Sequence, residues 1–339
     1  MASTTPAEHH LLAVGTFNTP ELFTVSYDPS DESLELLKTS KAVGNHSWLS
    51  FDASKQNLYA TCWTQPPTVA AYRIAREQGH GAQFELLGTA WTRARSGYVK
   101  EYATANGDRY LVSISGPSGE IWKLDGKTGA FLDQPSSSEG RGSSDDSFTH
   151  IQDLDFVTGE CKMRDGTSGS FVPSGIASNK AAAFGDFGGL RHGAHGIEFS
   201  PARDIAYVPD IGRNCIWVYT VRQEDGCFEL LQKCVAPRPN DGPRHTWSHP
   251  NGKIIYSVEE HTSMVDVFEL VGEKGDRRLE WRQAGKILPD GYDAQDFWAD
   301  EVRLSPAANG SYPEYLIAST RALKPETEGY VSIYKLDSS

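Results

Sequence analysis

The chain of 339 residues lacks the features that mark several common functional classes. It contains no run of about 20 apolar residues, the length that a helix needs to cross a bilayer. It has no excess of positive charge, because 32 Lys and Arg stand against 45 Asp and Glu, for a formal net charge of -13. A protein that binds the nucleic-acid backbone uses such an excess to displace counterions. The composition therefore disfavours a membrane protein and a general nucleic-acid binder, and a small-molecule partner is expected instead.

Cysteine is scarce, and its five copies form no CxxC pair: Cys62, Cys161, Cys215, Cys227 and Cys234. An odd number of scattered cysteines is typical of reduced thiols rather than of a disulfide framework. The first ten residues, MASTTPAEHH, have neither the basic n-region nor the apolar h-region of a secretory signal. We therefore expect a cytoplasmic protein.

Motifs for nucleotide cofactors, serine nucleophiles and metals are also missing. No GxSxG is present, and no GxGxxG follows a strand and opens a helix. His245 and His249 are four residues apart, but this stretch has the pattern of a strand and turn, and such a spacing on a strand separates two residues by about 13 Å. No clustered carboxylates accompany the histidines at ligand-like spacing. We expect no catalytic metal and no cofactor.

What the chain does contain is a repeated unit of short strands. Residues 242–270, GPRHTWSHPNGKIIYSVEEHTSMVDVFEL, contain two apolar segments around Asn251-Gly252, a strong hairpin signal. A third segment, residues 264–268, alternates with the two-residue period of a strand. Similar units occupy residues 193–221 and 299–336, and weaker copies begin at residues 11, 47 and 102. Amphipathic helix patterns are almost absent.

Repeats of this length predict one all-β domain over residues 1–339, a β-propeller in which radial closure protects the sheet edges. The count of repeats gives six blades, with seven as the alternative. Residues 133–190 are rich in Ser, Gly and Asp and predict a long loop insertion close to the mouth of the propeller. A degenerate extra repeat around residues 148–162 is an alternative for part of this stretch.

Aligned copies of the repeat indicate where chemistry is concentrated. The position before the first strand holds His195, Arg244 and Asp300 in three successive copies. The position that closes the second strand holds Glu260 and Arg321. Because antiparallel neighbours bring the start of one strand beside the end of the next, both positions lie at the same end of every repeat. A radial arrangement would bring these ionisable side chains to one mouth.

The segment GPRHTWSHPNGKIIYSVEE resembles the signature of the lactonase-type propeller family, which includes 6-phosphogluconolactonases and the fungal 3-carboxy-cis,cis-muconate cyclases. The cyclase branch is the more similar one, through motifs at His9-His10, Ser47-Trp48, His195-Gly196 and Ser319-Thr320-Arg321. In that branch a His, two Arg and a Glu are implicated in catalysis. The matching positions here are His195, Arg244, Arg321 and Glu260.

Each candidate residue has a chemical role and a structural alternative. His195 can move a proton near neutral pH, or only bond blade backbone. Arg244 and Arg321 offer planar forks for carboxylate or enolate oxygens, or form salt bridges between blades. Glu260 is an acid or base, or orients Arg244 by pairing with it. A substrate-binding wall is expected from four further residues, although large aromatic residues in propellers often pack between blades: Trp48, Trp63, Trp247 and His245.

The resemblance implies a cofactor-independent cyclase that closes a ring through a C–O bond. The muconate cyclases carry a blade beyond the segment that matches residues 330–336, and they lack the insertion before His195. These departures favour a natural-product enzyme of the hetero-Diels–Alder type, which joins a quinone methide to an alkene. The alternatives are a 3-carboxy-cis,cis-muconate lactonising enzyme, a sugar-lactone hydrolase and a non-catalytic propeller scaffold.

Overall fold

A computed structural model describes residues 9–77, 81–132, 150–163, 193–307 and 312–337. These residues form six antiparallel sheets, numbered here as blades one to six in chain order. Blade one comprises β1 (His10–Gly15), β2 (Glu21–Asp28) and β3 (Ser33–Lys41), and blade two comprises β4 (Leu49–Phe51), β5 (Asn57–Cys62), β6 (Thr68–Glu77) and β7 (Gly81–Trp91). Blade three comprises β8 (Tyr98–Ala103), β9 (Arg109–Ile114), β10 (Ser118–Leu124), β11 (His150–Asp155) and β12 (Cys161–Met163).

Blade four comprises β13 (Glu198–Phe199), β14 (Ile205–Asp210), β15 (Cys215–Val221) and β16 (Phe228–Val235). Blade five comprises β17 (Pro243–Ser248), β18 (Ile254–Glu259), β19 (Met264–Val271) and β20 (Arg278–Lys286). Blade six comprises β21 (Phe297–Leu304), β22 (Tyr315–Ala322) and β23 (Val331–Lys335), and a 3-10 turn, η3 (Ala294–Asp296), precedes it. The described part of the chain confirms the all-β propeller and its six blades.

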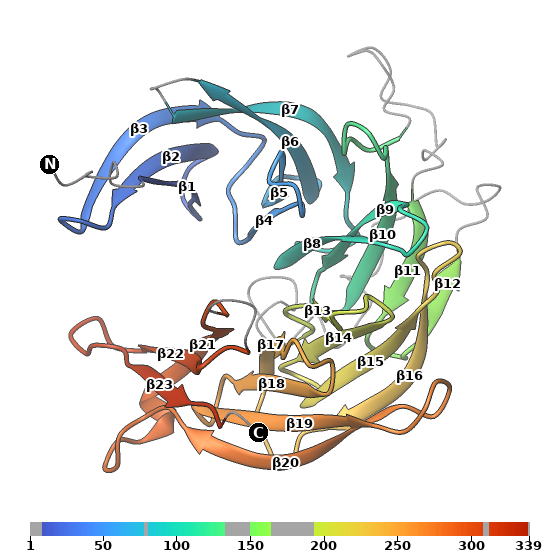
Figure 1. Ribbon diagram of the computed structural model, residues 1–339, viewed down its shortest axis with the longest axis vertical. Coiled ribbons are helices and arrows are strands. Elements are labelled where there is room, and N and C mark those ends of the chain that lie inside the picture. The colour runs from blue at the N-terminus through green and yellow to red at the C-terminus, as the bar shows by residue number, and fades with distance from the viewer. Residues whose placement is uncertain (1–8, 78–80, 133–149, 164–192, 308–311, 338–339) are drawn as a thin grey trace, which may run out of the picture.

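The blades follow one another around a centre, and β4, β8, β13, β17 and β21 lie nearest to it (Figure 1). Neighbouring blades contact each other through β3 and β7, β4 and β8, β12 and β16, β14 and β17, and β17 and β21. No comparable contact joins the first and last blades within the described residues, and Figure 1 shows these two blades facing one another across the open side of the ring.

The two blades at the open side are incomplete and carry exposed apolar residues. Each has three strands in the described part of the chain, whereas the other four blades have four or five. On blade one, Leu11 and Phe17 are 47% and 57% exposed, and on blade six, Val331 and Ile333 are 66% and 65% exposed. Side chains of this kind are normally buried between blades, because burial of one large apolar side chain stabilises the fold by about 1.5–3 kcal/mol.

The predicted loop insertion over residues 133–190 is wrong for its middle part. Residues 150–163 contain β11 and β12, which add two strands to blade three. Leu154 and Phe156 are fully buried in the core between blades three and four. The alternative of a degenerate extra repeat is right that this part contains strands, but these strands extend blade three and form no separate repeat. The rest of the predicted insertion lies outside the described residues.

Aromatic side chains fill the interface between blades three and four. Tyr102 of β8 stacks on Phe199 of β13 with ring centroids 4.8 Å apart, and both rings are buried. The Tyr102 hydroxyl donates a hydrogen bond to the Gly226 carbonyl oxygen, so the polar end of the ring is satisfied. Such interfaces hold neighbouring blades at a defined distance. This spacing positions the side chains at the ends of the blades that face the mouth of the propeller.

All five cysteines are unpaired, as expected from their spacing. Among the described residues, no helix has the length and apolar character needed to cross a membrane.

Candidate active site

Two β-bulges place the candidate residues of blades five and six at the same end of the propeller. The register between β17 and β18 shifts between Pro243 and His245, which leaves Arg244 as the extra residue. The register between β21 and β22 shifts between Ala299 and Glu301, which leaves Asp300 as the extra residue. A bulge redirects its side chain out of the normal alternation, and bulges are common next to active sites. The equivalence of Arg244 and Asp300, inferred from repeat register, is thus matched by local geometry.

Alternating charges run from Glu260 across two blades to Arg321. Arg244 Nη1 donates to Glu260 Oε2 at 2.5 Å, and its Nε donates to the Asp300 carbonyl oxygen at 3.1 Å. The Asp300 carboxylate lies 3.6 Å from Arg244 Nη2 and accepts a bond from Arg321 Nη1 at 2.5 Å. Asp300 therefore bridges the two arginines. The Glu260 side chain is buried, whereas 46% of the Arg321 side chain is exposed, so the network runs from the interior to solvent.

Three further titratable side chains, from blades four, five and six, contact one another in a row near this network. His195 Nδ1 lies 3.2 Å from His245 Nε2, and His245 Nδ1 lies 3.2 Å from Glu301 Oε2. We call His195, His245 and Glu301 the relay. Glu301 also accepts bonds from the Val302 backbone N–H and from Arg303.

The environment determines which members of the relay carry charge. Burial alone would raise the pKa of Glu301, but His245, Arg303 and the Val302 N–H lower that pKa to about 2, so this carboxyl is ionised. Burial lowers the pKa of His245, and the Glu301 carboxylate partly offsets this effect. Burial, together with the positive charges of Arg244 and Arg321, lowers the pKa of His195 well below its usual range. Both histidines are therefore neutral at pH 7 without substrate.

These charge states determine the tautomers. A carboxylate only accepts, so His245 carries its proton on Nδ1 and offers Nε2 as an acceptor. His195 must then donate from Nδ1, so its Nε2 is unprotonated and carries a lone pair. One added proton at this Nε2 moves the positive charge along the relay toward Glu301 and converts Nε2 into a donor. The relay can therefore accept a proton and return it.

Glycine allows blades four and five to approach closely enough for the relay to form. A Cβ added to Gly196 would lie 2.9 Å from His245 Cδ2 and 3.2 Å from the Arg244 carbonyl oxygen. A Cβ on Gly193 would lie 2.6 Å from the Gly116 backbone of blade three. The glycines of the segment HGAHG, residues 192–196, thus permit close approach between blades.

The predicted aromatic wall is present only in part. Trp48 stacks on Tyr98 with centroids 4.0 Å apart and meets the edge of His245 at 5.1 Å. The Arg303 guanidinium lies 4.2 Å from the Trp247 ring centroid. Of the predicted wall residues, His245 belongs to the relay and Trp48 contacts it there. Trp247 lies next to the relay through Arg303, which bonds Glu301.

Trp63 has a different environment from the other predicted wall residues. Its ring packs against Phe17 and beneath Arg95, and its Nε1 donates to the Ser96 carbonyl oxygen. None of these contacts reaches the relay.

The structure links three of the four predicted catalytic residues, Arg244 to Glu260 and, through Asp300, to Arg321. The fourth, His195, is close enough for the charges of Arg244 and Arg321 to contribute to its lowered pKa. Their catalytic roles remain a prediction. Three contributors were not selected from the sequence: Asp300, which occupies the same repeat position as Arg244, and Tyr98 and Glu301. The alignment of the repeats places Asp300 at the position of Arg244 and could have identified it. No sequence motif indicated Glu301, because its importance depends on a contact with the neighbouring blade.

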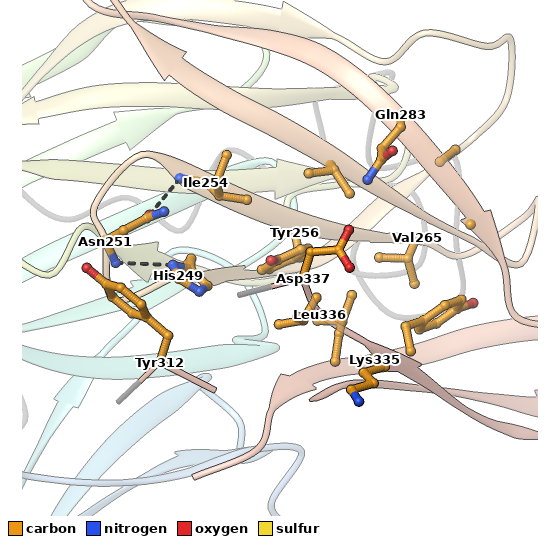
Figure 2. A pocket seen from close by; sticks show the side chains of 15 residues that line it. His249, Asn251, Ile254, Tyr256, Val265, Gln283, Tyr312, Lys335, Leu336 and Asp337 are labelled. Atoms are coloured by element: carbon orange, nitrogen blue, oxygen red, sulfur yellow. Dashed lines mark hydrogen bonds between the residues drawn. The ribbon is translucent and has the colours of Figure 1, made fainter. Parts of the chain in front are cut away.

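A cavity of about 450 Å³ lies between blades five and six, away from the relay (Figure 2). His249 and Asn251 line it, and both belong to the turn after β17, at the opposite end of that strand from Arg244. Figure 2 shows Tyr312 beside His249, and the Asn251 backbone N–H bonds His249 Nδ1 at 3.2 Å. None of the described residues that line this cavity is an arginine, whereas the side-chain network contains Arg244 and Arg321.

Comparison with known proteins identifies the family. Residues 11–146 and 190–339 match the family described as "Lactonase, 7-bladed beta-propeller". The chain belongs to this family. Its six described blades are one fewer than the seven in the family's description.

Relatives within the lactonase family are named as enzymes. Over 331 residues, 37% are identical to "Muconate cycloisomerase 1" of Cutaneotrichosporon cutaneum, a match that covers 98% of this chain and 76% of the relative. "Carboxy-cis,cis-muconate cyclase" of Neurospora crassa is 22% identical over 342 residues, covering 97% and 78%. The predicted class, a cyclase or isomerase enzyme, is confirmed.

Solved structures support the fold. The periplasmic gluconolactonase PpgL of Pseudomonas aeruginosa superimposes with a TM-score of 0.64 at 17% identity, covering 97% of this chain and 84% of that one. At this level of identity the similarity describes the propeller and carries no information on the substrate.

The relay predicts a specific effect of Glu301→Gln. A neutral amide no longer stabilises a protonated His245, so the relay should lose its proton at lower pH. We expect the alkaline limb of the pH profile of kcat to move to lower pH, and kcat at pH 7 to fall roughly 10–100-fold. The matched control is Glu314→Gln, an exposed residue just before β22, which should leave the profile unchanged. An unshifted profile in a folded Glu301→Gln variant would contradict the relay.

Proposed function

We propose that this protein is a cofactor-independent lactonising cyclase acting on conjugated diene dicarboxylates of the muconate class. The observation that carries the proposal is the alignment to a muconate cycloisomerase over nearly the whole chain, with a proton relay beside two arginines. Arg244 and Arg321 would bind the carboxylates of the substrate, and His195 would handle the proton.

The proposed reaction needs one proton and no redox partner. One substrate carboxylate oxygen forms a C–O bond to an alkene carbon, and the π electrons move toward the second carboxylate. That carboxylate then carries enolate charge, which a guanidinium fork stabilises more strongly than it stabilises the ground state. The carbon next to it takes a proton from His195 Nε2. A dianion plus one proton becomes a lactone monoanion, so each turnover consumes one proton from solvent.

Substrate binding would favour protonation of the relay. In the free protein the positive charges of Arg244 and Arg321 lower the pKa of His195. Two bound carboxylates offset those charges, so the pKa of His195 rises when substrate binds. His195 then takes up a proton at Nε2 and passes charge through His245 toward Glu301. Since the protonated relay is the active form, the rate of cyclisation should fall as pH rises through the apparent pKa of the complex.

The test is a spectrophotometric assay combined with proton counting. The purified protein is mixed with cis,cis-muconate or with 3-carboxy-cis,cis-muconate, and loss of the diene absorbance is followed in weak buffer containing a pH indicator. We expect one proton to be taken up for each diene lost. Hydrolysis of a sugar lactone would instead release a proton, so gluconolactone in the same buffer tests the hydrolase alternative. A folded protein that consumes neither diene would contradict the proposal.

A second candidate is a natural-product cyclase of the hetero-Diels–Alder type. The observation that favours it is the exposure of Arg321, together with the open side of the ring between blades one and six. A mouth that is open on one side accommodates a bulkier and less charged substrate than muconate. In this version Arg244 and Arg321 would hold the carbonyl oxygen of a quinone methide, and the site would mainly supply orientation. Failure of both dienes in the assay would favour this candidate.

A further inference from the structure

Blade five contains a group of three buried carboxylates that the proposed reaction does not use. Asp241 precedes β17, Glu259 ends β18, and Asp266 lies in β19. All three residues have no exposed surface, and one oxygen from each lies within 4.8 Å of the other two. The sequence offered no hint of this group, because its members come from three separate segments.

Positive charge within the group does not balance the carboxylates. Arg238 Nε bonds Asp241 Oδ1 at 2.8 Å, and Arg238 Nη2 bonds both oxygens of Asp266 at 2.8 Å. Three carboxylates and one guanidinium leave a net charge of -2 when all are ionised. Burial of an uncompensated charge costs several kcal/mol, so either a proton or a further cation must neutralise the group.

Glu259 is the member without a well-formed hydrogen bond. Within the described residues, neither of its carboxylate oxygens has a partner at hydrogen-bonding geometry, although the side chain is completely buried and faces the two aspartates. The Ser257 hydroxyl, equally buried, lies beside it but makes no hydrogen bond of normal geometry with a described residue. Buried polar atoms almost always have a hydrogen-bond or metal partner, so these oxygens indicate that a ligand binds here.

Blade four shows how the same position is satisfied elsewhere. Asp210 ends β14 as Glu259 ends β18, and it pairs with the first residue of the next strand in the same register. Two residues further on, Trp217 donates its indole N–H to Asp210 at 3.0 Å. In blade five that place is taken by Asp266, an acceptor instead of a donor. The donor of blade four is therefore replaced by a second carboxylate.

We propose that Asp241, Glu259 and Asp266 bind one hard divalent cation, with Ca²⁺ the best fit. All three donors are carboxylate oxygens within 4.8 Å of one another, and Ca²⁺ accepts such ligands in flexible geometry, whereas Mg²⁺ demands a near-ideal octahedron. A double positive charge also balances the net charge of the group. The ion would link β18 and β19 to the turn before β17. These segments adjoin Arg244 and Glu260 in the sequence. It would thus be a structural ion, and the inference is independent of the proposed reaction.

The test measures ion content and thermal stability of the full-length protein. After treatment with EDTA and removal of the chelator, melting curves are recorded with and without Ca²⁺ at concentrations up to 5 mM. We expect Ca²⁺ to raise the Tm by roughly 3–8 °C, the effect of an ion present at about 100 times its Kd. Elemental analysis after dialysis against Ca²⁺ should find one ion per chain, and Mg²⁺ should produce a smaller shift.

Glu259→Gln distinguishes a metal ion from a proton. The amide mimics a protonated carboxyl, so a group neutralised by a proton should keep or gain stability on substitution. A metal site should lose its response to Ca²⁺ in this variant. Glu273→Gln, at an exposed position of the same blade, should respond as the wild type does. The proposal is overturned if the wild type binds no ion and shows no shift, or if Glu259→Gln retains the full Ca²⁺ response. The wild-type measurements decide the matter even if the variant does not fold.

Discussion

His195→Gln is expected to lower kcat for ring closure by about 10³-fold, which is within the usual contribution of a positioned acid or base. Glutamine retains hydrogen-bonding capacity and similar length, but it cannot accept and release a proton near neutral pH. Binding through Arg244 and Arg321 should persist, so KM should change little. The measurement is the initial rate of diene loss across a range of substrate concentrations.

His10→Gln is the control for this experiment, because His10 is an exposed residue on β1 of blade one. It should leave kcat and KM as they are. A His195→Gln variant that folds normally and retains more than about a tenth of wild-type kcat would show that the proton comes from another group, and His195 would then be a structural residue.

Arg244→Met is expected to damage both activity and stability. Removal of the guanidinium leaves the buried Glu260 without its 2.5 Å partner and deprives Asp300 of one of its two arginines. Loss of one partner of a buried ion pair destabilises proteins by about 3–5 kcal/mol. Loss of one donor to developing negative charge lowers kcat by about 10²–10³-fold. Chemical denaturation measures the first effect, and steady-state kinetics measures the second.

Two further variants separate these effects. Arg244→Met combined with Glu260→Gln should recover part of the lost stability, since no unpaired charge remains, but it should recover none of the activity. Arg282→Met is the matched control, because Arg282 also contacts two acidic residues, Glu269 and Glu280, but lies on an exposed edge. Exposed pairs contribute only about 0–1 kcal/mol. Equal destabilisation by Arg244→Met and Arg282→Met would contradict a buried network around Arg244.

The pattern of the strands was predictable because it depends on local alternation. Ile254 to Glu259 follows an Asn-Gly turn and forms β18, as its apolar run indicated. Strand direction then placed Arg244, Glu260 and Arg321 at one end of their blades, and the network among them follows from that placement. The strand pair at residues 150–163 was harder to recognise. It is flanked by polar segments, and its first strand is itself only half apolar, because Gln152 and Asp153 separate Ile151 from Leu154.

The sequence by itself determined the repeat, the propeller class, the family and the end of the propeller at which ionisable residues gather. Those features depend on periodicity and on matched motifs, and both can be recognised along the chain. Only the tertiary structure decided that Glu301 meets His245, that Trp63 packs against Phe17 and Arg95, and that Glu259 faces two further carboxylates. Each of these depends on how closely one segment approaches another. That distance depends on residues such as Gly196 and on the bulges at Arg244 and Asp300, whose effects appear only when the blades are packed together.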